Sequence, residues 1–218
     1  MILLGAGVLM LQHPTSPVPR AWNPFEPLNV TDAVNLLTPY KLAKAVREPE
    51  QCLAALNDAE TGFTPLADLV ESPQCGIANR VAVTRFGASR VSAVETTCDV
   101  ALRMEMWERH SLQPLARQHL GSEIVGISHL SSYNCRPIRG SSTRMSLHAT
   151  GEAIDIVGFE LADGRSLRLL EDWRREPAFF VAARDAACLW FETVLGPDYN
   201  ALHANHFHLQ SRGWGTCR

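Results

Sequence analysis

The chain has 218 residues, of which 46% are hydrophobic and 20% charged, a composition typical of an ordinary folded domain with a substantial core. Its formal net charge of -3 argues against a nucleic-acid partner, since no basic run offsets the acidic excess. Beyond the first residues, no stretch approaches the roughly 20 apolar residues that a transmembrane helix needs.

The N-terminal residues 1–11 (MILLGAGVLML) form an apolar run, and a proline-rich stretch over residues 12–37 follows it. The run is typical of a signal peptide or membrane anchor, and the proline-rich stretch of an extended linker. No Lys or Arg precedes the run and no clear Ala-x-Ala cleavage site follows it, so a buried N-terminal strand or helix is the alternative. We expect the folded domain to occupy residues 38–218.

The pattern of apolar residues predicts helices over residues 39–56, from Glu95 to Gly121 with a break at Pro114, and over residues 176–195. Alternation predicts strands over residues 80–86, 123–128, 153–160 and 206–210. An Asp163-Gly164 turn joins the third of these strands to residues 165–170 as a hairpin. Helices mixed with short hairpin-joined strands indicate an α+β fold, a small antiparallel sheet flanked by helices.

The six cysteines include no Cys-x-x-Cys pair, which argues against a thiolate zinc site or a redox motif. Their even number and wide scatter are typical of three disulfides formed in an oxidising compartment, whereas free thiols in a cytosolic protein are the alternative. If sequence neighbours pair, the disulfides are Cys52–Cys75, Cys98–Cys135 and Cys188–Cys217.

An acidic residue, Asp155, lies in the middle of the apolar strand 153–160. A buried carboxylate costs several kcal/mol unless it is paired or bound to a metal. It can therefore cap a helix, pair with a nearby arginine, or ligate a metal ion. The candidate arginines are Arg136, Arg139 and Arg144.

Three histidines favour the interpretation of Asp155 as a metal ligand. His206 and His208 are two residues apart on a predicted strand and project to the same face, while Phe207 projects to the other. His148 precedes the Asp155 strand, with a glycine between that permits a tight turn. A set of His148, Asp155 and one of the two C-terminal histidines suits zinc and leaves a fourth position open, as in catalytic sites. Iron, cobalt and nickel also accept such ligands.

The segments SLHATGEAID (146–155) and HANHFH (203–208) resemble the Ser-x-His-x-x-Gly-x-Ala-x-Asp and His-x-His signature of a zinc peptidase superfamily. Its members include lysostaphin-type enzymes, D-alanyl-D-alanine carboxypeptidases, murein endopeptidases and Hedgehog domains. More closely, the blocks CLAAL, CGI, SYNCRP, DIVGFEL and ACLWFETVLGP resemble the bacterial extensin-like protein C-terminal domain, over about residues 38–218. The resemblance implies a Hedgehog/D-Ala-D-Ala-peptidase-like fold. The N-terminal apolar run and the six cysteines favour export, to a periplasmic location, free or membrane-anchored.

Residue by residue, the resemblance implies that His148, Asp155 and His208 bind zinc and that His206 is the catalytic partner. It also implies that Arg136 lies near the scissile carbonyl, where it would stabilise an oxyanion; a surface salt bridge is the alternative. Asn205 stands where carboxypeptidase relatives carry a glutamate base, which favours the endopeptidase-like branch.

Two further residues, His203 and Ser146, are candidates for contacting and orienting the ligands; for His203, a substrate contact or a plain surface position are the alternatives. The expected activity is zinc-dependent hydrolysis of peptide bonds in peptidoglycan. A non-catalytic zinc-containing module that binds the cell wall is the alternative, and a disulfide-rich domain without metal is a third.

Overall fold

A large mixed sheet forms the centre of the computed structural model, which describes residues 10–13, 15–141 and 143–218. Within these residues the sheet has nine strands in the order β1-β4-β5-β6-β7-β10-β9-β11, with β8 paired to β7. The strands are β1 (Gly62–Pro65), β4 (Arg80–Phe86), β5 (Ser89–Thr97), β6 (Ile124–His129), β7 (Ala153–Leu161), β8 (Ser166–Arg168), β9 (Thr193–Leu195), β10 (Phe207–Gln210) and β11 (Thr216–Cys217). A separate hairpin joins β2 (Leu69–Ser72) to β3 (Cys75–Ile77).

The mixed helix-and-sheet class is confirmed, but the predicted small antiparallel sheet is wrong. Two pairs, β5–β6 and β9–β11, are parallel, and the short strands β1, β9 and β11 were not predicted. Strands of two to four residues are too short to show the alternation from which a strand is predicted.

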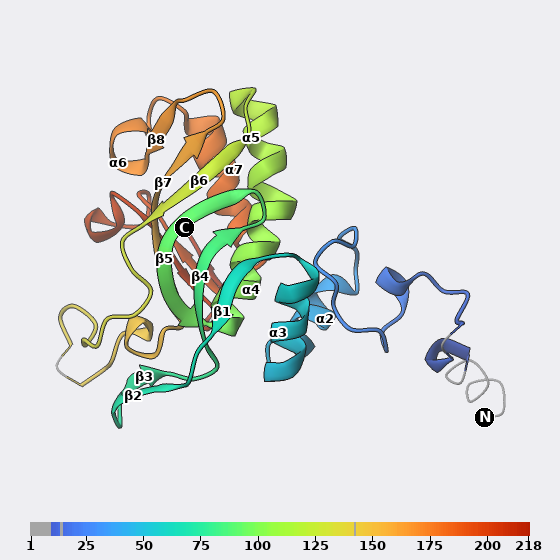
Figure 1. The fold of residues 1–218 in the computed structure, drawn as a ribbon. Helices are drawn as coiled ribbons and strands as arrows, with labels where there is room; N and C mark the ends of the chain where they lie inside the picture. Colours follow the sequence, from blue (N-terminus) through green and yellow to red (C-terminus); the bar gives the residue numbers. More distant parts are fainter. Residues whose placement is uncertain (1–9, 14, 142) are drawn as a thin grey trace.

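Helices α4, α5 and α7 pack together on one side of the sheet (Figure 1). The helices are α2 (Thr38–Ala45), α3 (Pro49–Asp58), α4 (Cys98–Trp107), α5 (Gln113–Leu120), α6 (Leu169–Asp172) and α7 (Pro177–Ala187), with a π-helical turn, Glu108–Leu112, between α4 and α5. Short 3-10 turns are η1 (Arg20–Trp22), η3 (Leu147–Thr150) and η4 (Ala201–His203). Trp107 of α4 makes edge-to-face ring contacts with Phe159 and Phe207 of the sheet, which closes the core between the two layers.

Three predicted helices have different limits in the structure. The first is two helices, because Pro49 starts α3 after a short link. The second begins at Cys98 and not at Glu95, because the preceding residues belong to β5. The Thr97 hydroxyl caps this helix by accepting a hydrogen bond from Val100 N (3.2 Å). The helix continues past Pro114, which follows the π-helical turn Glu108–Leu112 at the start of α5.

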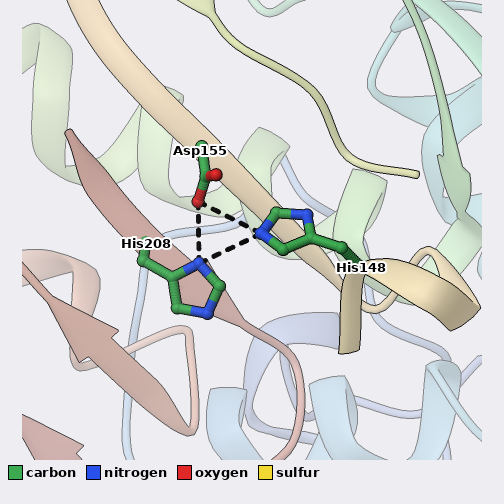
Figure 2. A group of neighbouring side chains, drawn as sticks. All are labelled: His148, Asp155 and His208. Atoms are coloured by element: carbon green, nitrogen blue, oxygen red, sulfur yellow. Dashed lines mark hydrogen bonds and ion pairs between the residues drawn. The ribbon is translucent and has the colours of Figure 1, made fainter. Parts of the chain in front are cut away.

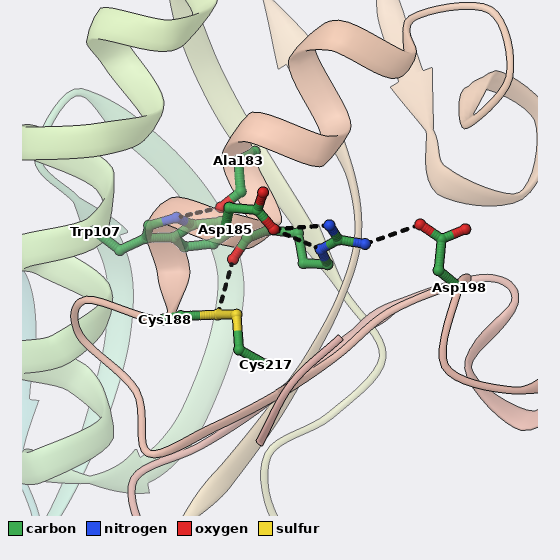
Figure 3. Close-up of a disulfide and its surroundings, with 7 residues drawn as sticks. Trp107, Ala183, Asp185, Cys188, Asp198 and Cys217 are labelled. Carbon is green, nitrogen blue, oxygen red and sulfur yellow. Dashed lines mark hydrogen bonds and ion pairs between the residues drawn. A yellow bond between two sulfur atoms is a disulfide. The ribbon is translucent and has the colours of Figure 1, made fainter. Parts of the chain in front are cut away.

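The third helix, α7, ends at Ala187, and residues 193–195 form β9 instead. The disulfide Cys188–Cys217 ties the residue after α7 to the last strand (Figure 3). Arg184 contacts the carboxylates of Asp185 and Asp198 at 2.7 and 2.8 Å. Both aspartates are labelled in Figure 3. The chain therefore turns back beside the sheet after α7 and does not continue as a helix.

Of the three predicted disulfides, Cys188–Cys217 is confirmed and the other two are wrong. The structure pairs Cys52 with Cys98 and Cys75 with Cys135. Cys52 lies on α3, which packs against α4, where Cys98 is the first residue. Cys75 lies on β3, beside the segment that follows β6. Sequence proximity therefore failed as a guide, because packing and not chain order brings these residues together.

The N-terminal segment is only partly described. Residues 1–9 of the predicted signal peptide or anchor lie outside the described residues. Among the rest, no helix is long and apolar enough to cross a membrane. The end of the proline-rich stretch packs on the domain: Leu28 and Val30 are buried, and the His110 ring contacts the Val30 carbonyl oxygen at 2.7 Å through Nε2.

Candidate metal centre

Asp155 and His208 face each other across the pairing of β7 with β10. Alternation divides the residues of these strands between two faces. Ile154, Ile156, Phe207 and Leu209 project into the core and are fully buried. Asp155 and His208 project to the opposite face, where they are 8% and 7% exposed. The strand pairing thus places a carboxylate and an imidazole side by side on the face away from the core.

His148 approaches from a 3-10 turn that immediately precedes β7. The Ser146 side chain caps this turn and accepts a hydrogen bond from His148 N at 3.3 Å. The turn ends at Gly151, whose φ of 65° is left-handed and favours glycine. The chain then reverses into β7, so that His148 meets Asp155, seven positions later in the sequence.

The three side chains converge on one point (Figure 2). Asp155 Oδ1 lies 2.7 Å from His208 Nδ1 and 3.3 Å from His148 Nε2, and the two nitrogens are 3.2 Å apart. One ligand atom from each residue lies within 4.8 Å of the others. Two imidazole nitrogens and a carboxylate oxygen form the donor set of a three-ligand zinc site.

The surroundings of the two imidazoles fit metal binding. His148 Nδ1 lies 2.8 Å from the Ser132 carbonyl oxygen, so Nδ1 carries the proton and the lone pair of Nε2 faces the other ligands. His208 Nε2 lies 2.5 Å from the side-chain amide of Gln210. The amide oxygen of Gln210 can accept a proton from this nitrogen after a half-turn, which leaves Nδ1 of His208 free as a ligand atom.

Asp155 is therefore paired with histidines and not with arginines. Burial would raise the pKa of its carboxyl, but the imidazoles of His148 and His208, which donate hydrogen bonds to it and carry positive charge when doubly protonated, hold that pKa well below its usual range. Among the described residues no arginine forms an ion pair with Asp155. The carboxylate is ionised and available as a ligand at neutral pH.

His206 lies beside the three ligands. Its Nε2 is 3.5 Å from Asp155 Oδ1, while its Nδ1 lies 2.8 Å from the Asn205 side-chain oxygen. The Asn205 oxygen accepts the proton on Nδ1, so the unprotonated Nε2 faces the site. Burial lowers the pKa of His206, which keeps the ring neutral and able to accept a proton.

His203 lies behind His206, with ring centroids 5.2 Å apart, and 5.6 Å from His208. Burial, the most important cause, and the nearby charges of His208 and His206 together lower the pKa of His203 to about 4. Its Nδ1 lies 2.8 Å from the Asn200 side-chain oxygen, which orients the ring. His203 and Ser146 thus both lie next to the cluster, as expected of residues that support the ligands.

Arg136 is half-buried in the segment after β6. Its guanidinium donates to the Pro137 carbonyl at 3.4 Å and forms no ion pair with any described residue. The surface salt bridge considered from the sequence is thus not formed.

Three residues that orient the histidines, Ser132, Asn205 and Gln210, were not predicted in that role. Ser132 acts through its backbone carbonyl, which no residue identity reveals. The Ser132 hydroxyl donates to the Ala153 carbonyl at 2.6 Å, and this hydrogen bond holds Ser132 against β7. Gln210 carried a detectable signal, because it lies two residues after His208 on the same face of a strand.

The large sheet with helices on one side and a buried His-Asp-His cluster on the other defines an α/β domain with a candidate metal centre. The family described as extensin-like protein C-terminus matches residues 50–218. The chain belongs to this family, as the sequence blocks indicated. No curated protein and no solved structure gave a significant match.

Proposed function

We propose that this chain is a zinc-dependent hydrolase of peptide bonds in peptidoglycan stem peptides or crosslinks, of the endopeptidase-like branch. The observation that carries the proposal is the convergence of three ligand atoms from His148, Asp155 and His208, with the unprotonated Nε2 of His206 beside them. A zinc ion held there would polarise a carbonyl and lower the pKa of a bound water from about 15.7 towards about 7.

The roles of the other residues follow from their positions. Nε2 of His206 accepts the proton of the attacking water and returns it to the leaving amine, as a general base and acid. Asn205 keeps His206 in the tautomer that this transfer needs. Arg136 supplies a guanidinium to the oxyanion that develops on the scissile carbonyl. The order of zinc ligands and the His-x-His strand support a Hedgehog/D-Ala-D-Ala-peptidase-like relationship.

A location outside the cytoplasm is part of the proposal. The three disulfides are the kind of crosslink that persists in an oxidising compartment. We propose that the domain is exported to the periplasm, free or attached to the membrane through its N-terminal segment, where peptidoglycan is the abundant peptide polymer.

The test is digestion of purified peptidoglycan and of synthetic stem peptides by the zinc-loaded full chain, with new termini identified by mass spectrometry. We expect cleavage that a chelator abolishes and that zinc restores. The His206→Gln variant should keep its zinc and lose cleavage, whereas His119→Gln, a histidine on α5 away from the cluster, should behave as the wild type.

The alternative function, a non-catalytic zinc-containing module that binds the cell wall, gives a different result. In that case zinc-loaded protein co-sediments with peptidoglycan, and no new termini form. A folded chain that takes up no zinc would contradict both functions.

A further inference from the structure

The segment between β6 and β7 is strongly basic in an otherwise acidic protein. Residues 124–151 contain no Asp or Glu but three arginines, Arg136, Arg139 and Arg144, whereas the whole chain has a net charge of -3. None of the three forms an ion pair with a described residue. A concentration of unpaired arginine next to a candidate catalytic centre indicates binding of an anionic group.

The arginines lie on a short hairpin that leads into the turn carrying His148. Pro137 pairs with Met145 in an antiparallel bridge, and Ile138 N donates to the Arg144 carbonyl at 2.8 Å. We call residues 134–146 the arginine hairpin; of these, residue 142 lies outside the described residues.

One face of the arginine hairpin is set by its pairing. Ser146 N donates to the Arg136 carbonyl at 3.1 Å, which places these two residues opposite each other. Opposite residues, and residues two apart, project to the same face of an antiparallel pair. Arg136, Arg144 and Ser146 therefore share a face, and the Ser146 hydroxyl on that face contacts His148 N.

The arginine hairpin is held in place from the other side by the β2–β3 hairpin, which lies next to it in Figure 1. The disulfide Cys75–Cys135 joins the two, and the Tyr133 hydroxyl donates to the Glu71 carboxylate at 2.5 Å. At its base, Asn134 N donates to the His148 carbonyl at 2.9 Å. The arginines thus stand on a covalently anchored element, which limits the entropy lost when they bind a ligand.

We propose that Arg144, on the face shared with Ser146, binds a carboxylate of the substrate beside the metal centre, so that the protein selects peptides with a free carboxylate near the scissile bond. This inference rests on the proposed function, because it names the substrate class of that site. Stem peptides offer two such groups, an internal α-carboxylate and the C-terminal carboxylate. Guanidinium–carboxylate pairs are charge-assisted and can be bidentate, which makes them selective for the acid over its amide.

The test uses three fluorescent stem pentapeptides: one with both carboxylates free, one amidated internally and one amidated at the C-terminus. Affinity for the zinc-loaded full chain is measured by anisotropy in the first seconds after mixing, before turnover. We expect about tenfold tighter binding of the free acid than of at least one amide, equivalent to about 1.4 kcal/mol. The amidation that weakens binding identifies the carboxylate that the protein recognises.

Two variants separate the arginine hairpin from general charge. The Arg144→Gln variant should bind acid and amide within about twofold of each other, with its zinc content unchanged. Arg47→Gln, an exposed arginine between α2 and α3, removes one charge elsewhere and should keep the full preference.

Equal affinity of the wild type for acid and amides, absence of binding to all three peptides, or an undiminished preference in the Arg144→Gln variant would overturn the inference. Its failure can be told from that of the proposed function. If the protein prefers the free acid but cleaves no peptide, the hydrolase is contradicted and carboxylate recognition stands. If it cleaves peptides without preferring the free acid, carboxylate recognition is contradicted and the hydrolase stands.

Discussion

Replacing Asp155 with asparagine removes one of three candidate ligands and almost no volume. Its Oδ1 lies within 3.3 Å of both imidazole ligand atoms. Asp155 is the one carboxylate in the cluster among the described residues. The amide oxygen that replaces it is neutral and a weaker zinc ligand. We therefore expect Asp155→Asn to fold and to lose most of its zinc affinity.

The size of the loss follows from the number of ligands. Structural zinc sites with four protein ligands bind with about 10–16 kcal/mol, or about 2.5–4 kcal/mol for each ligand. A loss of this size corresponds to a dissociation constant about 100- to 1000-fold higher. The free energy of unfolding of the zinc-free protein should fall by only about 1–3 kcal/mol, because the neutral amide oxygen is a weaker hydrogen-bond acceptor for His208 and His148 than the carboxylate.

The assay is competition for zinc with a chromophoric chelator, supported by native mass spectrometry of the full chain. The wild type should bind one zinc and unfold at a higher temperature when zinc is present, since a ligand of the native state stabilises it. Asp185→Asn is the matched control, because Asp185 is an exposed carboxylate paired with Arg184. It should bind zinc as the wild type does.

Two results would refute this reasoning. If Asp155→Asn bound zinc with the wild-type affinity, the carboxylate would not be a ligand. If the folded wild type stayed free of zinc after equilibration with the ion, the His-Asp-His cluster would be a hydrogen-bonded group and the metal centre would be rejected.

Three further predictions concern the catalytic partner, the arginine hairpin and the buried acids. His206→Gln should change zinc affinity by no more than about twofold and lower kcat by about 10²- to 10⁴-fold; a proportional loss of zinc would instead make His206 a ligand. Cys75→Ser with Cys135→Ser opens a loop with a sequence separation of 60 and should lower the free energy of unfolding by about 4 kcal/mol, measured by urea denaturation; unchanged stability would argue against this pairing. Burial raises the pKa of Glu105 and Glu108 above the usual 4.5, so their contribution to stability is present at low pH and is lost as pH rises through the raised values. Glu105→Gln with Glu108→Gln should therefore flatten the dependence of unfolding free energy on pH, by up to about 1.4 kcal/mol per pH unit for each group; a slope equal to that of the wild type would contradict the raised pKa values.

The candidate site was largely predictable because its residues combine local pattern with distinctive chemistry. Asp155 stood out as an acid inside an apolar strand, and the spacing of His206 and His208 placed both on one face. The fold was less predictable. Residues 89–97 contain Glu95 and Thr96 among few apolar residues, so β5 lacks a clean alternation, although it lies near the middle of the sheet.

The sequence by itself determined the candidate ligand residues, the core-facing residues of β7 and β10, and membership of the family, because each depends on residues close together in the chain. Only the tertiary structure decided which cysteines pair, that the Ser132 carbonyl orients His148, and that the arginine hairpin stands beside the centre. These features depend on strand order and on backbone atoms. Neighbouring residues do not encode which distant segments meet, since that is settled by the packing of the whole core.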